Sequence, residues 1–519
     1  MGDRDRMPLT VVGLDGASPN VFERWLDDLP TLRSLIGDGF SGTLKSTDPP
    51  VTNVAWTSFA TGKRPETTEV FDWVYIDEDY RPRTYRGDEV RQRALYDLVP
   101  GSTYVNLPAV YPREPTAEGA DVVYAFDAPD STVALPAGFR GWPEADDYVS
   151  GKPDDDLAPI DQIRRMREIE AARFALAKRA FRETDELFYV LFSSTDFGLH
   201  TIQELDGAIA EEFRELYRDI DGYIQWFRER SDDLVVMSDH GFEEKTRQVF
   251  VSEWLREQGY LRLADPAATG GDGALLRRLV PAAVLDNDVL YGLGRRVLGA
   301  LDAVAGADGS RGVYEAFAEA DFDYGATQVF KDGGLWNLVV NYEDVFEEGC
   351  VPRDEASDLL EAVVDGLAAL EDPATGRPVF EDVRVASEAR RAHPRAPDVV
   401  LEPTAGVSVA GRSMRRRVFD DTQTHAHRKD GFVVAAGDSF TAGEGEASIV
   451  DVAPTLLHVL GRPVPEDCDG AVIREALAAP GDVAVGPPAV LDGPPPTRDG
   501  GGDDDEAVLQ RRLEELGYM

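Results

Sequence analysis

Acidic and imidazole side chains follow three apolar segments of the chain. Asp15 comes directly after LTVVGL. Asp196 follows VLFSST, with His200 four residues later, and the pair Asp239 and His240 follows LVVMS. Carboxylates and neutral imidazoles are ligands of zinc and manganese, and mixed sets of them commonly hold two such ions about 3.5–4 Å apart. The residue types therefore predict a two-metal site, provided that the three segments end at the same place in the fold.

The three apolar segments read as buried strands of a parallel sheet. Each is short and apolar and is stopped by Gly, Asp or Ser, as is typical of strands covered on both faces. Amphipathic stretches predict helices at about residues 20–38, 161–184 and 206–230. Alternating strands and helices favour an α/β fold, with a mostly parallel sheet flanked by helices on both faces. Ligands gather at the carboxyl ends of the strands in such a sheet, so the acidic and imidazole groups should converge.

Each of these residues also has a plain structural interpretation when it is taken alone. Asp15 could simply end a strand, Asp196 could cap a helix, and His200 could lie on the surface. The pair Asp239 and His240 could form an ordinary turn between a strand and a loop. The joint occurrence of these residues in order, in a chain with only 6 histidines, favours the metal site.

The ordered motifs GLDG, PPVTNVAWTSFATGKRP, STDFGLH, MSDHGF and HRKDGFVVAAG resemble the type I phosphodiesterase and nucleotide pyrophosphatase branch of the alkaline phosphatase superfamily. The stretch IVDVAPTLLHVLGRPVPEDCDG resembles the C-terminal core helix of that group and the segment after it. The resemblance covers about residues 1–250 and 390–475. It implies an alkaline-phosphatase-like fold, two divalent metal ions (zinc, or alternatively manganese) and hydrolysis of phosphodiester or pyrophosphate bonds.

The resemblance also implies how the ligands divide between the two ions. The residues that match the first metal site are Asp196, His200 and His427. The residues that match the second metal site are Asp15, Asp239 and His240, with Thr52 joining this set as the nucleophile. His425 competes with His427 for the last ligand position, but HRKDG matches the His-Arg-x-Asp-Gly pattern of the family and favours His427.

Thr52 matches the nucleophile of the family by its spacing to Thr61 and Gly62. A threonine hydroxyl is a poor nucleophile until a metal lowers its pKa. The apparent helix that follows it, NVAWTSFATG, would direct N–H groups and its dipole at a phosphoryl oxygen. The implied course is attack by Thr52, a phosphothreonine intermediate, and then attack by water. The alternative role for Thr52 is that of a helix N-cap.

The neighbouring Asn53 resembles the Thr-Asn pair of phosphonoacetate hydrolases in the same superfamily, and we include it among the catalytic candidates. Ala55 matches the position of a later Asn in the diesterases, which changes part of their oxyanion pocket. A phosphonate hydrolase or a phosphomonoesterase, which would use the same metals, is therefore the nearest alternative. A phosphotransferase or phosphomutase would use the same groups with another acceptor, and a non-catalytic metal-binding protein is the simplest alternative. A sulfatase is disfavoured, because threonine cannot be converted to formylglycine.

The remaining pattern predicts a discontinuous core with insertions. We expect the catalytic core at 1–260 and 421–478, a helical insertion at 261–320, an α+β cap at 321–420, a flexible linker at 479–503 and a docked helix at 504–519. Within the first part of the core, residues from about 64 to 160 read as mainly loop. His393 in the predicted cap could lie in the substrate pocket, and the alternative is a position on the surface. The aromatic residues Trp56, Trp73 and Tyr75 could line a pocket or pack inside the core.

The composition excludes several classes of protein. Hydrophobic residues make up 43% of the chain, which is ample core material, and a formal charge of -44 would repel nucleic-acid polymers. The charge is spread along the chain, which favours a haloarchaeal-like protein kept soluble in concentrated salt. The distant Cys350 and Cys468, with no apolar run of membrane-spanning length, favour a cytoplasmic protein. The expected partner is a small phosphate ester such as a nucleotide, a lipid head group or a sugar phosphate.

Overall fold

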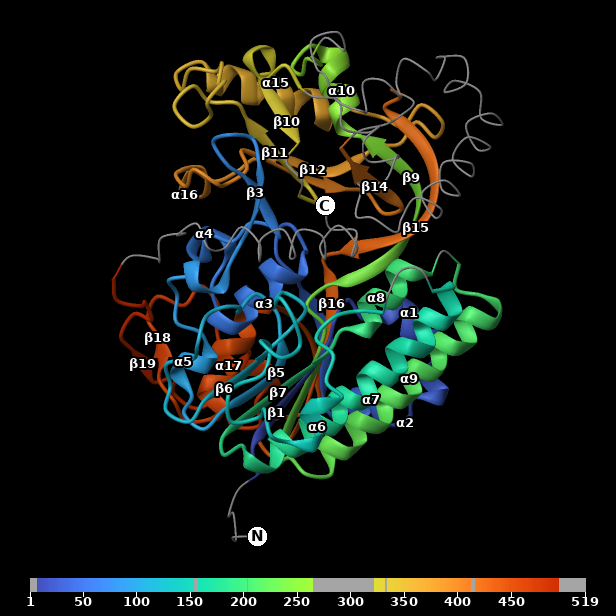
Figure 1. Cartoon of the computed structure of the whole chain (residues 1–519), viewed down its shortest axis with the longest axis vertical. Helices are drawn as coiled ribbons and strands as arrows, with labels where there is room; N and C mark the ends of the chain where they lie inside the picture. The colour runs from blue at the N-terminus through green and yellow to red at the C-terminus, as the bar shows by residue number, and fades with distance from the viewer. Residues whose placement is uncertain are drawn as a thin grey trace. The chain divides into compact units, whose positions relative to one another are not determined.

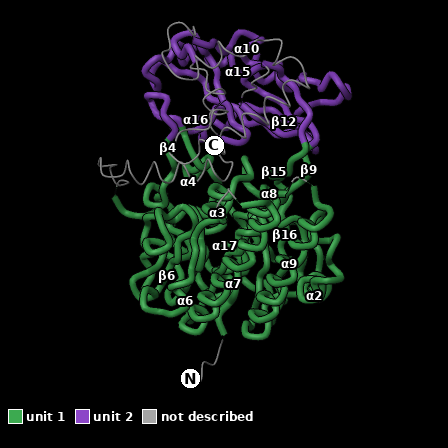
Figure 2. The backbone as a smooth tube through the Cα atoms, turned by 45° about the vertical axis from the view of Figure 1, so that its right-hand side comes forward, with its two compact units in different colours: residues 1–75, 83–245, 423–519 green, residues 76–82, 246–422 purple. Residues whose placement is uncertain are grey.

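A computed structural model of the chain describes residues 7–153, 157–202, 204–264, 322–331, 334–411 and 416–493. The chain divides into two compact units, shown in different colours in Figure 2. Unit 1 consists of residues 1–75, 83–245 and 423–519, and unit 2 consists of residues 76–82 and 246–422. The sequence predicted boundaries near 260 and 420, and the long segment of unit 2 spans residues 246–422. Most of the predicted insertion at 261–320 and the predicted helix at 504–519 lie outside the described residues.

Unit 1 is built on an eight-stranded sheet (Figure 1). In spatial order its strands are β17 (Gly443–Ser448), β2 (Phe40–Lys45), β16 (Asp430–Gly437), β8 (Asp233–Met237), β1 (Leu9–Leu14), β7 (Leu187–Phe192), β5 (Thr103–Leu107) and β6 (Asp121–Tyr124). Strand β16 is antiparallel to both of its neighbours, and the other pairs in this sheet are parallel. The predicted mostly parallel α/β fold is therefore confirmed.

Helices cover both faces of this sheet. On one face lie α2 (Pro30–Asp38), α7 (Pro159–Glu183) and α9 (Gly207–Arg228), and on the other lie α3 (Thr52–Thr61) and α17 (Val452–Val459). Successive residues of β7 show why both faces need cover. Phe188 packs on Phe227 of α9, while Tyr189 packs on Trp56 of α3. Because consecutive side chains of a strand point to opposite faces, an apolar strand such as LFYVLF demands a helix on each side.

Shorter elements complete unit 1. They are α1 (Pro19–Phe22), α4 (Pro65–Thr68), α5 (Leu95–Leu98), α6 (Pro143–Asp146), α8 (Ser194–Thr201), β18 (Val464–Pro465) and β19 (Val485–Gly486). The last strand lies within the predicted linker, of which residues 479–493 are described. The interpretation of residues 64–160 as mainly loop was wrong in one respect, because β5 and β6 of the main sheet lie there. Both strands are so short, at 5 and 4 residues, that their apolar runs hardly stand out among the surrounding turns.

Unit 2 contains a four-stranded and a three-stranded sheet. The first has the order β10 (Val329–Lys331), β11 (Asn337–Val340), β13 (Val399–Pro403) and β12 (Phe380–Val385), and its pairs are antiparallel. The second has the order β14 (Val407–Ala410), β9 (Gly241–Phe250) and β15 (Phe419–Arg428), of which β9 and β15 run on into unit 1. The helices are α10 (Val251–Gln258), α15 (Ala356–Ala368) and the short α16 (Glu388–Arg391).

Residues 76–82 belong to unit 2, although the chain on either side of them belongs to unit 1. They connect the short strands β3 (Val74–Ile76) and β4 (Pro82–Thr84). Tyr80 stacks on Tyr324 with ring centroids 3.6 Å apart and on Phe346 with centroids 5.2 Å apart, and its hydroxyl donates to Asn341 Oδ1. This aromatic contact explains why the loop packs with unit 2.

Candidate metal centre

Three buried carboxylates meet where β1, β7 and β8 end. Asp15 directly follows β1, Asp196 lies in the first turn of α8 directly after β7, and Asp239 follows β8. Because β1 pairs in parallel with both β7 and β8, the ends of the three strands are neighbours. Backbone contacts join them further, since the N–H of Gly16 donates to Asp239 Oδ1 at 3.1 Å and the hydroxyl of Thr195 donates to the carbonyl of Asp15 at 2.6 Å.

Gly16 allows this close approach. Its φ of +61° lies in the left-handed region, which L side chains rarely adopt. A Cβ atom at this position would lie 2.9 Å from Asp196 Oδ1 and 2.9 Å from Cε2 of Phe242. The Asp-Gly sequence therefore combines a strand-end carboxylate with a turn that leaves room for the second carboxylate.

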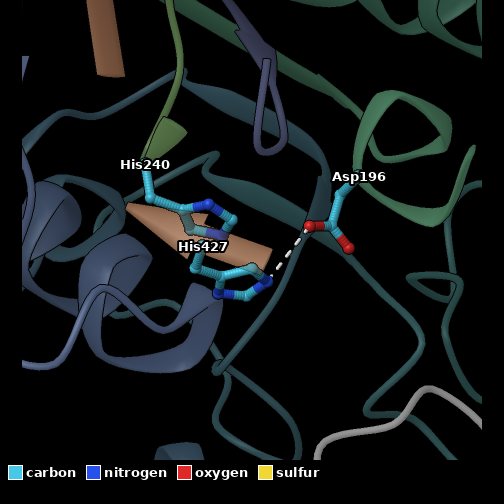
Figure 3. Close-up of side chains that lie close together, drawn as sticks. All are labelled: Asp196, His240 and His427. Carbon is cyan, nitrogen blue, oxygen red and sulfur yellow. Dashed lines mark ion pairs between the residues drawn. The ribbon is translucent and has the colours of Figure 1, made fainter. Parts of the chain in front are cut away.

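Three histidines face these carboxylates. His240 Nε2 lies 3.4 Å from Asp239 Oδ2 and 3.7 Å from Asp15 Oδ1. His427, from β15, places its Nε2 3.4 Å from Asp196 Oδ1, as Figure 3 shows. The rings of His240 and His427 stack with centroids 3.9 Å apart. The structure thus brings together imidazoles from segments that are far apart in the sequence.

The third histidine is His200, at the end of α8. Its Nε2 lies 3.1 Å from His427 Nε2 and 3.6 Å from Asp196 Oδ2, and its side chain keeps 28% of its surface exposed. His240 and His427 are fully enclosed by comparison. If an ion binds here, His200 is therefore the ligand on the open side of the site.

The ring orientation of the two buried histidines is fixed by backbone carbonyls. His427 Nδ1 contacts the carbonyl of Pro50 at 2.9 Å, and His240 Nδ1 contacts the carbonyl of Gly241 at 3.2 Å. With Nδ1 as donor, each ring presents an unprotonated Nε2 to the carboxylates, which is the form that binds a metal.

The potential ligand atoms form two groups, and within each group all the atoms lie within 4.8 Å of one another. The first is Asp196, His240 and His427, and the second is Asp15, Asp239 and His240. His240 belongs to both groups, so it is a candidate ligand for either ion. His200 belongs to neither group but contacts two members of the first, Asp196 and His427, and its assignment to the first metal site stays a prediction.

Burial and mutual repulsion dominate the electrostatics of the carboxylates. Burial, with the neighbouring Asp239 and Asp196, raises the pKa of Asp15 well above its usual value. Burial and Asp196 raise the pKa of Asp239 to about 7. Burial would also raise the pKa of Asp196, but His200 and His427 beside it lower that pKa to about 2. The site therefore concentrates more negative charge than the surrounding protein offsets.

The local environment favours the neutral forms of His200 and His240. Burial is the main factor that lowers the pKa of His200 to about 4 and the pKa of His240 well below its usual value. Neutral imidazoles beside crowded carboxylates fit divalent cations, which would bind the former and neutralise the latter. The buried Oδ2 atom of Asp239 has no hydrogen-bond partner among the described residues, which also fits a metal ligand. The donor set suits zinc or manganese.

Thr52 lies against the second group of ligand atoms. It is the first residue of α3, it is fully buried, and its Oγ1 lies 3.3 Å from His240 Nε2 and 3.4 Å from Asp15 Oδ1. The N-cap position belongs to Val51, which makes no side-chain cap. The alternative interpretation of Thr52 as the N-cap residue is therefore not what the structure shows.

Asn53 is buried beside Thr52, and its Nδ2 donates to the carbonyl of Asp72 at 3.0 Å. His425 is buried, and its Nδ1 contacts the carbonyl of Ile202 at 3.0 Å; neither group of candidate ligands contains it. His393 is half-buried in unit 2, where its Nδ1 accepts from the N–H of Arg395.

The aromatic residues that could have lined a pocket are packed in the interior. Trp56 contacts Phe59 and Tyr189, and Trp73 contacts Phe126. Tyr75, only 7% exposed, contacts Tyr85.

Sequence reasoning missed some contributors to the site. The backbone carbonyls of Pro50 and Gly241 orient His427 and His240. Every residue has a backbone carbonyl, so the sequence cannot predict which of them contact a histidine. Lys152 lies close enough to His200 to add to the lowering of its pKa, after burial. The only sequence signal for Lys152 is its charge, in a chain where basic residues are the minority.

Comparison with known proteins identifies the family of the chain. The family model for type I phosphodiesterase / nucleotide pyrophosphatase matches residues 9–432, and the chain belongs to this family. The protein is thus an enzyme of a metal-dependent family that hydrolyses phosphoester bonds, and the structure supplies candidate carboxylate and histidine ligands. No curated protein matches the sequence.

Solved structures share the fold. Murine ectonucleotide pyrophosphatase / phosphodiesterase 5, in an inactive form with bound AMP, aligns with a TM-score of 0.50 and 10% identity over 91% of this chain and 100% of that chain. Phosphonoacetate hydrolase from Sinorhizobium meliloti, in complex with phosphonoformate, aligns with a TM-score of 0.53 and 15% identity over 88% of this chain and 95% of that chain. At these identities the likeness concerns the fold.

Among the described residues, no helix has both the length and the apolar character that crossing a membrane requires.

Proposed function

We propose that this protein hydrolyses phosphodiester or pyrophosphate bonds of small nucleotide-type substrates through a phosphothreonine intermediate on Thr52, with two divalent ions, preferably zinc. The observation that carries the proposal is the position of the Thr52 hydroxyl, within 3.4 Å of two candidate ligands and at the N-terminus of α3. Both partners of this hydroxyl, the carboxylate of Asp15 and the imidazole of His240, belong to the second group of candidate ligands, so an ion held there would lie next to the hydroxyl. The AMP complex of the murine neighbour supports a nucleotide-type substrate.

The proposed reaction has two steps at phosphorus. The Thr52 hydroxyl loses its proton, its oxygen forms a bond to phosphorus, and the leaving alcohol or phosphate departs with the electron pair of the broken P–O bond. Water then attacks the phosphothreonine and releases Thr52. The N–H groups at the start of α3 would bind a non-bridging oxygen in both steps. When bound, the ions supply charge neutralisation and a lower pKa for the attacking hydroxyl.

A phosphonate hydrolase or phosphomonoesterase is the second candidate. The adjacent pair Thr52 and Asn53 favours it, and one structural neighbour is a phosphonoacetate hydrolase. The Asn53 side chain already donates to the carbonyl of Asp72, so only its remaining hydrogen-bonding capacity could serve a substrate. A phosphotransferase would instead need an acceptor alcohol that competes with water.

Substrate preference can be tested with a panel. The zinc-loaded and manganese-loaded protein would be assayed with bis(p-nitrophenyl) phosphate, p-nitrophenyl phosphate, ATP and phosphonoacetate, with glycerol as the added acceptor. We expect the diester and ATP to be hydrolysed fastest. Preference for the monoester or the phosphonate would favour the second candidate, and phosphoryl transfer to glycerol in place of hydrolysis would favour the transferase.

The nucleophile can be tested with a matched pair of threonines in α3. Thr52→Ala should lower turnover by several orders of magnitude and lose the acid-trapped phosphoryl label, whereas Thr52→Ser should keep part of both. Thr61→Ala, at the far end of the same helix, is the control and should behave as the wild type does. A chiral substrate should show net retention at phosphorus. Inversion, or a labelled Thr52→Ala protein, would refute the phosphothreonine intermediate.

A further inference from the structure

The turn between β7 and α8 carries the metal-ligand candidate Asp196, and it is held by residues outside the metal centre. The first backbone N–H groups of a helix lack partners within the helix, and the N-cap residue Ser193 makes no side-chain cap here. Instead, the N–H of Ser194 donates to Glu170 Oε1 at 2.9 Å. Glu170 lies in the middle of α7, so a carboxylate from a different helix caps the one that presents Asp196.

Glu170 is fully buried and forms an ion pair with the equally buried Arg173, one turn further along α7. A buried ion pair adds little net stability, because desolvation of the two charges offsets their attraction. Replacing a buried ion pair by well-packed apolar residues is often neutral for stability. The carboxylate therefore needs a reason beyond stability, and its hydrogen bond to Ser194 supplies one.

Two further side chains, those of Asn106 and Thr195, fix the same turn. Asn106 of β5 is fully buried, and its Nδ2 donates to the carbonyl of Leu191 at 3.0 Å and to Ser193 Oγ at 2.8 Å. The hydroxyl of Thr195 donates to the carbonyl of Asp15. Three successive residues before Asp196 are thus held by three different parts of unit 1.

We propose that Glu170 is a positioning residue for the metal centre, and this inference rests on the proposed function only in assuming that Asp196 and His200 bind an ion. By anchoring Ser194, Glu170 sets the direction of the first turn of α8. That direction decides whether Asp196 and, one turn later, His200 reach His427 at the distances observed. Loss of this anchor should weaken metal binding at the first site more than at the second. The candidate ligands of the second site follow β1 and β8 and do not depend on α8.

The test replaces the anchor without leaving an unpaired buried charge. The double variant Glu170→Met and Arg173→Met removes both charges and the acceptor for Ser194. The double variant Glu170→Gln and Arg173→Met removes both charges but restores an amide oxygen as acceptor. Changes to residues that orient metal ligands typically cost about 10–100-fold in metal affinity. For the Glu170→Met and Arg173→Met variant we expect a loss of that order in zinc affinity at the first metal site. The Glu170→Gln and Arg173→Met variant should recover a large part of that affinity.

Cobalt(II) gives a second readout that a purely structural role would not move. Its visible absorption reports coordination geometry, and we expect altered bands in the first variant and near-native bands in the second. Since the apolar double variant could fail to fold, Glu170→Asp provides another route: it keeps a carboxylate beside Arg173 but shortens its reach to Ser194, and it should also lower the affinity for zinc.

The matched control is another buried ion pair of unit 1, between Asp97 and Arg113. Replacing these by Asn and Met should lower the melting temperature but leave zinc affinity and the cobalt bands unchanged. Unchanged zinc affinity in a folded Glu170→Asp protein, or an equal loss of affinity in the control, would overturn the proposal. Zinc is measured without substrate, so a wild type that binds zinc but cleaves no phosphodiester would refute the proposed function alone. A wild type that binds no divalent ion would refute both.

Discussion

Gly16 offers a sharp test of how tightly the metal centre is packed. In Gly16→Ala the new Cβ would lie 2.9 Å from Asp196 Oδ1, whereas ordinary contacts of a Cβ begin at 3.4 Å. The carboxylate must therefore retreat by about 0.5 Å, which is the limit within which a metal or catalytic constellation has to be held. The backbone contributes separately, since a left-handed φ costs an L residue roughly 1–2 kcal/mol.

These two effects can be separated with a second glycine of unit 1. Gly207 has a similar φ of +57°, and a Cβ there would meet nothing within 4 Å. Gly207→Ala should therefore show the backbone cost alone. We expect both variants to lower the melting temperature of unit 1, but only Gly16→Ala to lose zinc affinity by about 10–100-fold and turnover with it.

The assays are zinc titration against a chromophoric chelator, hydrolysis of bis(p-nitrophenyl) phosphate and thermal unfolding of both variants beside the wild type. A Gly16→Ala protein that binds zinc and turns over substrate as Gly207→Ala does would refute the claim that this glycine makes room for Asp196. A turnover loss in Gly16→Ala with normal zinc binding would also contradict it, because the effect is argued through the ligand.

Three further outcomes follow from the charges of the site and the surface. Burial raises the pKa of Asp239 to about 7, so below that pH a proton competes with the metal. Zinc affinity should therefore fall by up to about tenfold per pH unit, and calorimetry in buffers of different ionisation enthalpy should detect the released proton. A pH-independent affinity between pH 5 and 7 would contradict this. Asp239→Ala and His427→Ala should abolish turnover but leave the fold intact by circular dichroism, because Asp239 follows β8 and His427 lies near the end of β15, so neither change removes a core residue of the main sheet; unfolding of both would indicate a structural metal instead. Molar KCl should raise the melting temperature by screening the formal charge of -44, and equal stability in dilute buffer would refute the halophile hypothesis.

The sequence was sufficient for the part of the fold that follows from local pattern. The strands before Asp15, Asp196 and Asp239 are continuous apolar runs, and the long helices α7 and α9 begin and end within two residues of their predicted limits. Parallel strands then place the three carboxylates at one edge without further information.

Features that depend on long-range pairing were harder to infer. His427 lies in β15, which neighbours β9 in one sheet and leads into β16, which pairs with β2 and β8 in another, so only the family motif pointed to it. The buried side chain of Glu170 looks like one more charged position on an amphipathic helix until its contact with Ser194 is seen.

The charge distribution ties the site to the stability of the sheet edge. Asp15, Asp196 and Asp239 lie at the ends of adjoining strands, and burial prevents water from screening their repulsion. Without a cation, burial and the neighbouring carboxylates raise the pKa values of Asp15 and Asp239 and so favour their protonated forms. Divalent ions would displace those protons and turn mutual repulsion into shared attraction. The ligands that we propose for catalysis are therefore also those whose ionisation opposes folding in the absence of metal, so the stability that a bound ion adds should increase as the pH rises toward 7.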